Sequence, residues 1–150
     1  MKIYLASSWR NTYQPAVLAE LRAAGHEVYD FRNPAPGSTG FSWRQVDPGL
    51  KDDLTAERMR ATLAHPVSQA GFDLDFDAMK WADAFVLLLP SGMSAHLEAG
   101  WACGAGKPVA VLAPEIREPE LMYKCFEDGR GAPLFATVGE ALFYLYGGTP

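Results

Sequence analysis

The residue in this sequence best suited to chemistry is a glutamate inside an apolar segment. Ser91–Lys107 reads S-G-M-S-A-H-L-E-A-G-W-A-C-G-A-G-K, and Glu98 is its one carboxylate. Ser94 is expected to cap a helix over Ser94–Ala105 that is small or apolar on nearly every face, as buried helices are. Burying a carboxylate is costly without a partner, and the helix N-terminus favours its ionised form. An ionised, partly desolvated carboxylate is suited to act as a nucleophile.

A structural role for Glu98 is the alternative. The carboxylate can complement the helix dipole, or it can close a capping box if the helix has Ala95 as its N-cap. Alanine is a poor N-cap, so the sequence favours the catalytic interpretation.

Acidic residues at alternate positions form a second candidate group, Asp73, Asp75 and Asp77. An EF-hand loop starting at Asp73 requires glycine at its sixth place and glutamate at its twelfth, where this chain has Ala78 and Ala84. Calcium binding is therefore disfavoured. Capping of the following helix and an ion pair with the nearby lysine account for two of the three acids, which leaves one to face a pocket.

A polar segment follows the first expected strand. Ser7–Asn11 (S-S-W-R-N) offers the hydroxyl of Ser7, the indole of Trp9 and the guanidinium of Arg10 just before a helix. Helix N-termini and arginine attract phosphate or carboxylate groups, although Arg10 as an ordinary surface residue is the alternative. The chain has no G-x-G-x-x-G and no G-x-x-x-x-G-K-[ST], which disfavours a dinucleotide fingerprint and a P-loop.

The remaining histidines and cysteines give no metal or disulfide pattern. His96 is two residues from Glu98, so the two side chains do not share a helix face. His96 either contacts substrate or is a satisfied polar residue against the preceding loop. Cys103 and Cys125 form no C-x-x-C pair, so no disulfide framework is expected, Cys103 is interpreted as a core residue, and a reducing cytoplasm is the simplest location. No metal site is expected.

Strands and helices alternate along the chain. Strands are expected at Lys2–Ala6, Glu27–Phe31, Ala84–Leu89, Val109–Leu112 and Leu134–Ala136. Helices are expected from Asn11 or Thr12 to Ala24, over Thr55–His65, Gly71–Ala82, Ser94–Ala105 and Glu118–Phe126, and through Leu145. This alternation predicts a single doubly wound α/β domain over residues 1–150, with a flavodoxin-like, five-stranded parallel sheet in the order 2-1-3-4-5.

In such a sheet, ligands bind beyond the carboxyl ends of the strands. The segments expected there are Ser7–Asn11, Phe31–Pro36, Pro90–Ser94 and Ala113–Arg117. The long loop Arg32–Leu50 is rich in proline and glycine, and loops of that length often act as lids. Its aromatic residues Phe41 and Trp43 either fold over a ligand or pin the loop to the body of the protein.

Composition excludes several functional classes. The 150 residues carry a formal charge of −5, which disfavours a basic groove for a nucleic-acid polymer. No apolar run approaches the ~20 residues of a membrane span, and the N-terminus lacks signal-peptide architecture. A cytoplasmic protein with neither membrane nor nucleic-acid partner is expected.

Three short motifs stand out: I-Y-L-A-S-S-W at Ile3–Trp9, the acid followed by A-D at Asp75–Asp83, and H-L-E-A-G-W-A…G-K at His96–Lys107. Together they resemble the nucleoside 2-deoxyribosyltransferase family and its nucleotide N-glycosidase relatives. The resemblance implies a doubly wound fold, a homo-oligomer whose subunits complete each other's sites, and no cofactor. It also implies that a glutamate, here Glu98, attacks the anomeric carbon of a nucleoside and forms a glycosyl-enzyme. Asp75 matches the family's aspartate near the base.

The resemblance also implies the substrate-binding residues. Aromatic residues of the first strand and loop correspond to Tyr4 and Trp9. Two positions depart from the transferases: Gly92 stands where an aspartate is common, and Glu120, in P-E-L-M with Met122, stands near the place of an asparagine from a neighbouring subunit. In the family's monophosphate hydrolases, hydroxyl groups surround the 5′-phosphate. The residues suited to that part here are Arg10, Ser91 and Ser94.

These residues predict cleavage or transfer of an N-glycosidic bond in a nucleoside or nucleoside 5′-monophosphate. Asp75 is the expected proton donor or relay for the leaving base. Two other functions stay open at this point. One is a nucleotide-sensing module without turnover, by analogy of fold alone. The other is NAD glycohydrolysis, which also breaks a bond at C1′.

Overall fold

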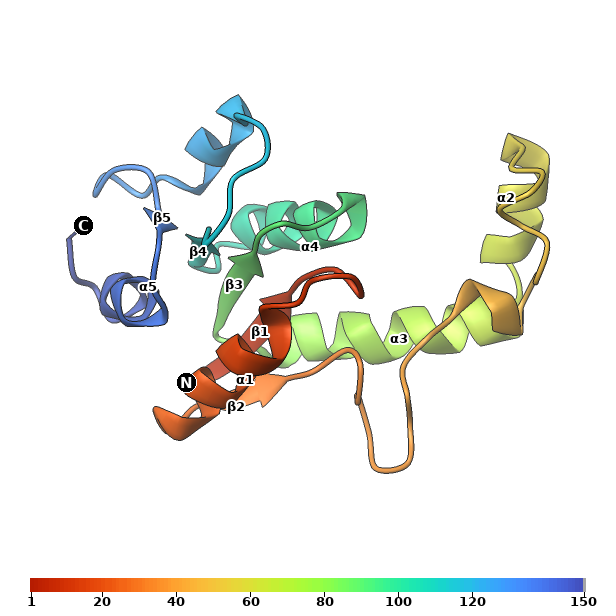
Figure 1. Ribbon diagram of the computed structural model, residues 1–150, viewed down its shortest axis with the longest axis horizontal. Coiled ribbons are helices and arrows are strands. Elements are labelled where there is room, and N and C mark those ends of the chain that lie inside the picture. Colours follow the sequence, from red (N-terminus) through yellow and green to blue (C-terminus); the bar gives the residue numbers. More distant parts are fainter. Residues whose placement is uncertain (150) are drawn as a thin grey trace. The chain divides into compact units, whose positions relative to one another are not determined.

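The computed structural model describes residues 1–149 and divides them into two compact units. One unit comprises Met1–Tyr29 and the chain from Trp81 onward, and the other comprises Asp30–Lys80. The first unit contains, in chain order, β1 (Lys2–Ala6), α1 (Gln14–Ala23), β2 (Glu27–Tyr29), β3 (Ala84–Leu88), α4 (Met93–Gly104), β4 (Val109–Leu112), the 3-10 helix η2 (Leu121–Phe126), β5 (Leu134–Phe135) and α5 (Val138–Leu145) (Figure 1).

The five strands form one parallel sheet in the order β2-β1-β3-β4-β5, which confirms the predicted flavodoxin-like topology. The apolar run that begins at Ala84 forms β3, and all of its residues are buried. Such a continuous run occupies a sheet interior because helices cover both faces there. The strand order reverses direction between β1 and β3, which is where ligands of this architecture bind.

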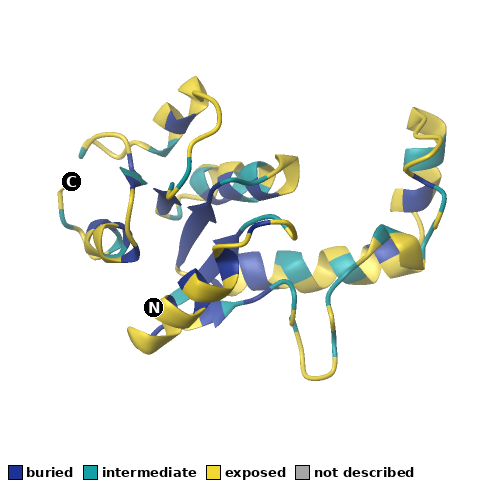
Figure 2. Ribbon diagram, viewed as in Figure 1, coloured by how far each residue is buried: buried dark blue, intermediate teal, exposed yellow. Residues whose placement is uncertain are grey.

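Side chains alternate between the two faces of the sheet. On one face, Ile3 and Leu5 of β1 pack with Val86 and Leu88 of β3 against Leu18 and its neighbours on α1. The core members from β4 and α5 are Leu112 and Val138. Figure 2 shows the strands buried while the outer surfaces of the helices are exposed. This face is therefore covered by α1 and α5.

The opposite face carries a row of aromatic rings. Tyr4 stacks between Tyr29, with ring centroids 5.3 Å apart, and Phe85, at 5.0 Å. Phe85 in turn meets Trp101 of α4 at 6.4 Å. Helix α4 thus covers this second face, and the row of rings crosses β2, β1 and β3.

The second unit contains η1 (Trp43–Gln45), α2 (Ala56–Leu63) and the portion of α3 (Pro66–Trp81) up to Lys80. The prediction that α3 begins at Gly71 is wrong: it begins at Pro66, because proline is well suited to the first helical position. The acids at 73, 75 and 77 therefore lie inside the helix and do not cap it. The predicted ion pair is confirmed, since Lys80 Nζ lies 2.6 Å from Asp77 Oδ1.

The long loop of the second unit is held by side chains of its own unit. Arg58 of α2 donates to both carboxylate oxygens of Asp47, each at 2.7 Å. The ring of Phe41 packs on Gly71 of α3 so closely that a Cβ there would be 2.8 Å from Phe41 Cδ2. Phe41 also meets Trp43 edge to face at 4.8 Å. These contacts favour the interpretation that Phe41 and Trp43 pin the loop, and the lid stays a prediction.

Candidate functional site

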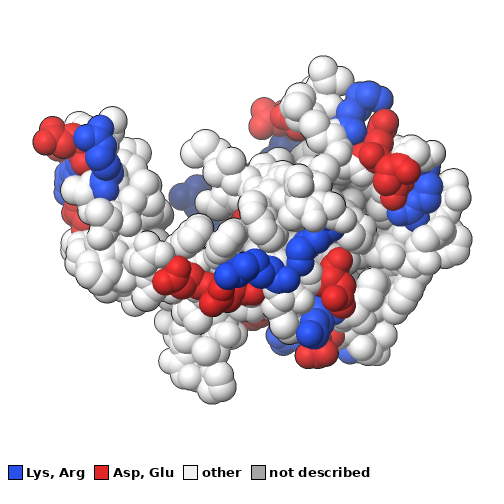
Figure 3. Space-filling model, turned by 180° about the vertical axis from the view of Figure 1, so that it is seen from behind, with Lys and Arg blue, Asp and Glu red and all other residues white. Residues whose placement is uncertain are grey.

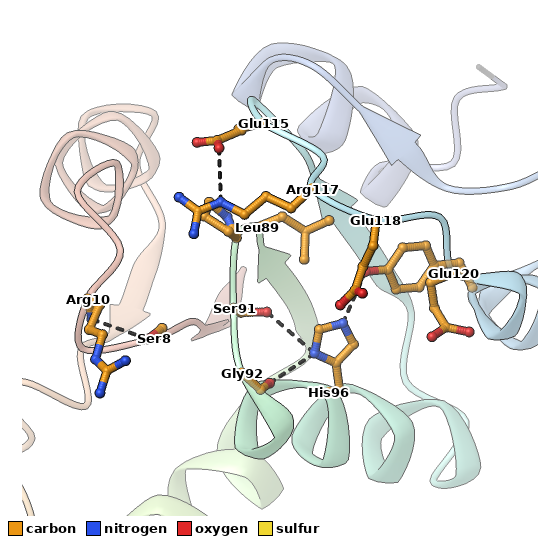
Figure 4. Close-up of a pocket in the computed structure, with 12 residues that line it drawn as sticks. Ser8, Arg10, Leu89, Ser91, Gly92, His96, Glu115, Arg117, Glu118 and Glu120 are labelled. Carbon is orange, nitrogen blue, oxygen red and sulfur yellow. Dashed lines mark hydrogen bonds and ion pairs between the residues drawn. The ribbon is translucent and has the colours of Figure 1, made fainter.

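A pocket of about 310 Å³ opens at the carboxyl ends of β1, β3 and β4 (Figure 4). It is lined by Ser8, Arg10, Leu89, Pro90, Ser91, Gly92, His96, Glu115, Arg117, Glu118, Glu120 and Tyr123. Within the first unit, the predicted segments after β1, β3 and β4 do meet at one site. Of the residues expected to bind substrate, the structure brings together Arg10, Ser91, Gly92, His96 and Glu120.

Helix α4 begins earlier than predicted. Its N-cap is Gly92, which has an extended backbone and no capping side chain, so Ser94 is the second helical residue and not the cap. Glu98 is consequently the sixth helical residue, which excludes a capping box and places it beyond the first turn, where the helix dipole acts most strongly.

His96 and Glu98 occupy opposite flanks of α4. Residues that are two positions apart in a helix are separated by about 200° around its axis, so the side chains of His96 and Glu98 point in nearly opposite directions. His96 faces the pocket and η2, whereas half-buried Glu98 lies on the flank shared with Ser94 and Trp101. Glu98 and Ser94 do not line this pocket. The candidate nucleophile and the pocket are therefore presented by two sides of one helix.

The imidazole of His96 is fixed by contacts at both nitrogens. Nδ1 lies 2.9 Å from the carbonyl oxygen of Gly92, and Nε2 lies 3.0 Å from the hydroxyl of Tyr123. A carbonyl only accepts, so Nδ1 carries the proton and Nε2 accepts from Tyr123. Burial, followed by the charges of Glu120 and Glu118, raises the pKa of Tyr123, which keeps its hydroxyl protonated as a donor.

The loop after β1 is anchored to the turn after β3. Asn11 is only 3% exposed, and its amide donates to the carbonyl of Pro90 at 3.0 Å. Ser7 Oγ donates to the carbonyl of Leu88 at 3.4 Å. This anchoring holds Arg10 at one side of the pocket, while Trp9 is 52% exposed and lies outside the lining.

Charge is distributed unevenly around the pocket. Arg10 stands on one side and Glu118 and Glu120 on the other, while Arg117 Nε pairs with Glu115 Oε1 at 2.9 Å (Figure 4). On the molecular face drawn in Figure 3, acidic and basic side chains are intermixed rather than gathered by sign. The arrangement suits a small ligand with one anionic end better than an extended polyanion.

The segment that carries Glu120 is a 3-10 helix over Leu121–Phe126, shorter than the predicted helix from Glu118. Glu120 is its N-cap, and its Oε1 accepts from the backbone N–H of Met122 at 2.8 Å. Met122 itself is 62% exposed and does not line the pocket. The capping bond explains why the 3-10 helix starts where it does.

Other predicted site residues lie elsewhere. Tyr4 is 1% exposed within the row of aromatic rings, and Asp75 is a half-buried residue of α3 in the second unit. Ser7 lies beside the pocket without lining it. The roles of these residues in binding or proton transfer stay predictions.

Parts of the recognised motifs sit at the amino end of the sheet, away from the pocket. Lys107 Nζ donates to the carbonyl of Ala82. Asp83 Oδ2 accepts from the backbone N–H of Lys2 at 2.8 Å. The A-D and G-K elements therefore tie together the chain where β1, β3 and β4 begin, which is a structural role.

Seven residues that line the pocket were not among the predicted site residues: Ser8, Leu89, Pro90, Glu115, Arg117, Glu118 and Tyr123. Four of them, Ser8, Pro90, Glu115 and Arg117, fall in the segments expected beyond the ends of the strands, and that placement was the available signal. Tyr123 carried none, because only the tertiary structure brings η2 beside α4.

Among residues 1–149, no group of three or more histidines, cysteines, aspartates or glutamates is placed to hold a metal ion. No helix in that range combines the length and apolar character needed to cross a membrane.

Comparisons with known proteins place the fold. No family model matches the sequence, and no curated protein matches it either. The structure is similar to that of a 2-deoxyribosyltransferase from the psychrotolerant bacterium Bacillus psychrosaccharolyticus, with a TM-score of 0.52 and 24% sequence identity. The similarity covers 81% of this chain and 79% of that one, and it shows a related fold.

Proposed function

We propose that this protein cleaves or transfers the N-glycosidic bond of a (deoxy)nucleoside or a nucleoside 5′-monophosphate, with Glu98 as the nucleophile. The proposal rests mainly on the position of Glu98. It is a half-buried carboxylate on α4, the helix that follows the fully buried strand β3. The fold related to that of a 2-deoxyribosyltransferase adds support.

The proposed reaction proceeds with retention of configuration in two steps. Glu98 attacks C1′ as positive charge builds on the sugar ring, and the bond from C1′ to the base nitrogen breaks. The departing base takes a proton, a role we assign to Asp75 on the resemblance to the family. Water then hydrolyses the glycosyl ester, or a second base accepts the sugar. None of these steps requires a cofactor.

The pocket is proposed to receive the 5′ end of a substrate whose sugar reaches Glu98 past the N-terminal end of α4, because Glu98 itself does not line the pocket. A 5′-phosphate suits the side of the pocket that presents Arg10 and the hydroxyl of Ser91, because an arginine binds phosphate through charge-assisted hydrogen bonds. Ser94 shares its flank of α4 with Glu98. The other proposed substrate contacts are Tyr4, Ser7, Trp9, Gly92, His96, Glu120 and Met122. On the resemblance to the family, the segment with Glu120 and Met122 would help to complete the site of a neighbouring subunit in a homo-oligomer.

Base release from a panel of ribo- and deoxyribonucleosides and their 5′-monophosphates, followed by chromatography, tests the proposal. Glu98→Gln is expected to lower release by roughly a thousandfold or more, because the nucleophile is removed. Glu20→Gln, which changes an exposed carboxylate of α1, is the matched control and should retain activity. Intact-mass analysis should detect a glycosyl adduct on the wild type and none on Glu98→Gln.

Three results would contradict the proposal. Base release by Glu98→Gln at the wild-type rate would exclude Glu98 as nucleophile. Tight binding of a nucleotide without any release over long incubation would indicate a sensing module. Release of nicotinamide from NAD, with every nucleoside and monophosphate left intact, would indicate a glycohydrolase of dinucleotides.

A further inference from the structure

Both cysteines of the chain meet in the folded protein, although they are distant in sequence. Cys103 lies near the end of α4 and Cys125 lies in η2. The Cys103 thiol donates to the carbonyl oxygen of Cys125 at 2.9 Å, and both residues are free thiols. They line a second pocket, of about 260 Å³, whose other walls include Lys107 and Tyr144. This pocket is separate from the candidate functional site.

The two cysteines belong to the junction between α4 and η2. His96 and Cys103 are seven residues apart, so they lie on the same flank of α4 two turns apart. Each meets a residue of η2: His96 contacts Tyr123, and Cys103 contacts Cys125. The short 3-10 helix is thus attached to α4 at two points, one of them made by the cysteines.

We propose that Cys103 and Cys125 form an oxidisable dithiol that closes to an intramolecular disulfide and locks η2 against α4. Cys125 is exposed and Cys103 is partly buried, so Cys125 meets a solvent oxidant first. Because the Cys103 thiol already contacts the backbone carbonyl of Cys125, it is held next to the residue whose oxidised sulfur it would attack. A disulfide of this transient kind is compatible with a reducing compartment.

Hydrogen peroxide is the class of oxidant that balances the reaction. The Cys125 thiolate attacks one peroxide oxygen, the O–O bond breaks, and Cys125 becomes a sulfenic acid while one water leaves. The Cys103 thiolate then attacks the sulfenic sulfur, the S–S bond forms, and the hydroxyl leaves as a second water. The two thiols lose two electrons, the peroxide gains them, and the two thiol protons end in water.

Closing this bond has a consequence for the candidate site. Tyr123 of η2 lines the functional pocket and forms a hydrogen bond with His96. Glu120, the N-cap of η2, lines the same pocket. A cross-link at Cys125 restrains that wall of the pocket. We expect slower amide hydrogen exchange in η2 and a higher melting temperature for the oxidised protein, because the bond closes a loop in the unfolded chain.

The test is oxidation of the reduced full-length chain with hydrogen peroxide at low protein concentration. The wild type should lose both titratable thiols and two hydrogens in mass, remain monomeric in non-reducing electrophoresis, and yield a Cys103–Cys125 cross-linked peptide. In guanidinium, the disulfide should form at least roughly tenfold more slowly, because the unfolded chain does not hold the two thiols together. Reduction should reverse every change.

Single variants separate the two roles. Cys103→Ser should accumulate a sulfenic acid on Cys125 that dimedone traps, and Cys125→Ser should keep its thiol under the same treatment. Circular dichroism confirms that each variant is folded. Retention of both thiols by the wild type, cross-linking between copies, or equal rates in the folded and denatured chain would overturn the proposal.

Discussion

The imidazole of His96 and the hydroxyl of Tyr123 meet at 3.0 Å although 27 residues separate them in the sequence. The bond joins α4 to η2 inside the wall of the candidate pocket. It also fixes the tautomer of His96, since the Gly92 carbonyl occupies the other ring nitrogen at 2.9 Å. A histidine whose nitrogens are both engaged is positioned by the protein before any ligand arrives.

Replacing Tyr123 with phenylalanine should release His96 Nε2 while retaining the ring that lines the pocket. We expect a loss of about 1 kcal/mol in the free energy of unfolding, because one hydrogen bond between neutral groups is removed. Nitrogen NMR of the wild type should show His96 protonated at Nδ1. A spectrum with the proton on Nε2 would contradict the geometry.

Two helical glycines should respond in opposite directions to alanine. Gly100 has open space around a Cβ, so Gly100→Ala should stabilise the protein by roughly 0.5–1 kcal/mol through helix propensity. Gly71→Ala places a Cβ 2.8 Å from Phe41 Cδ2 and should destabilise by about 1–2 kcal/mol despite the same propensity gain. Chemical denaturation of both variants measures the difference, and stabilisation by Gly71→Ala would show that Phe41 does not pack there.

Acid should weaken the ion pair between Asp128 and Arg130. The Arg130 guanidinium, 2.5 Å away, lowers the pKa of Asp128 from 3.8 to about 2. The folded state therefore binds fewer protons than the unfolded state between those values, so the contribution of Asp128 is complete above pH 4 and is lost as the pH falls toward 2. Denaturation curves of Asp128→Asn should lack that part of the acid dependence, and an unchanged profile would count against the pair.

Lys107 belongs to a recognised motif, yet its contact is structural. Because its ammonium donates to the Ala82 carbonyl at the amino end of the sheet, Lys107→Met should lower the free energy of unfolding by roughly 1–2 kcal/mol. The kcat/KM of the folded variant for base release should stay at the wild-type value. Glu98→Gln should instead lose base release while its free energy of unfolding changes little. A loss of activity in folded Lys107→Met would place the lysine in the chemistry.

The strands and the order of the sheet followed from local patterns. An apolar run such as Ala84–Leu88 predicts a buried strand because every side chain must leave water, and alternation with helices then leaves few topologies. Helix starts were less predictable. Helix α4 has Gly92 as its N-cap in place of the expected capping hydroxyl of Ser94, and α3 starts at Pro66, five residues before the predicted start. The start of a helix depends on the tertiary surroundings of the turn before it as well as on residue preference.

The sequence by itself determined the chemical inventory and the sheet: one carboxylate in an apolar helix, polar segments after strands, and parallel pairing. Only the tertiary structure decided which of these residues meet. It placed His96 against Tyr123, Cys103 against Cys125, and Glu98 on the other flank of α4. Such contacts depend on how elements far apart in the chain pack together, and the short-range periodicity that reveals a helix or strand carries no information about its distant neighbours.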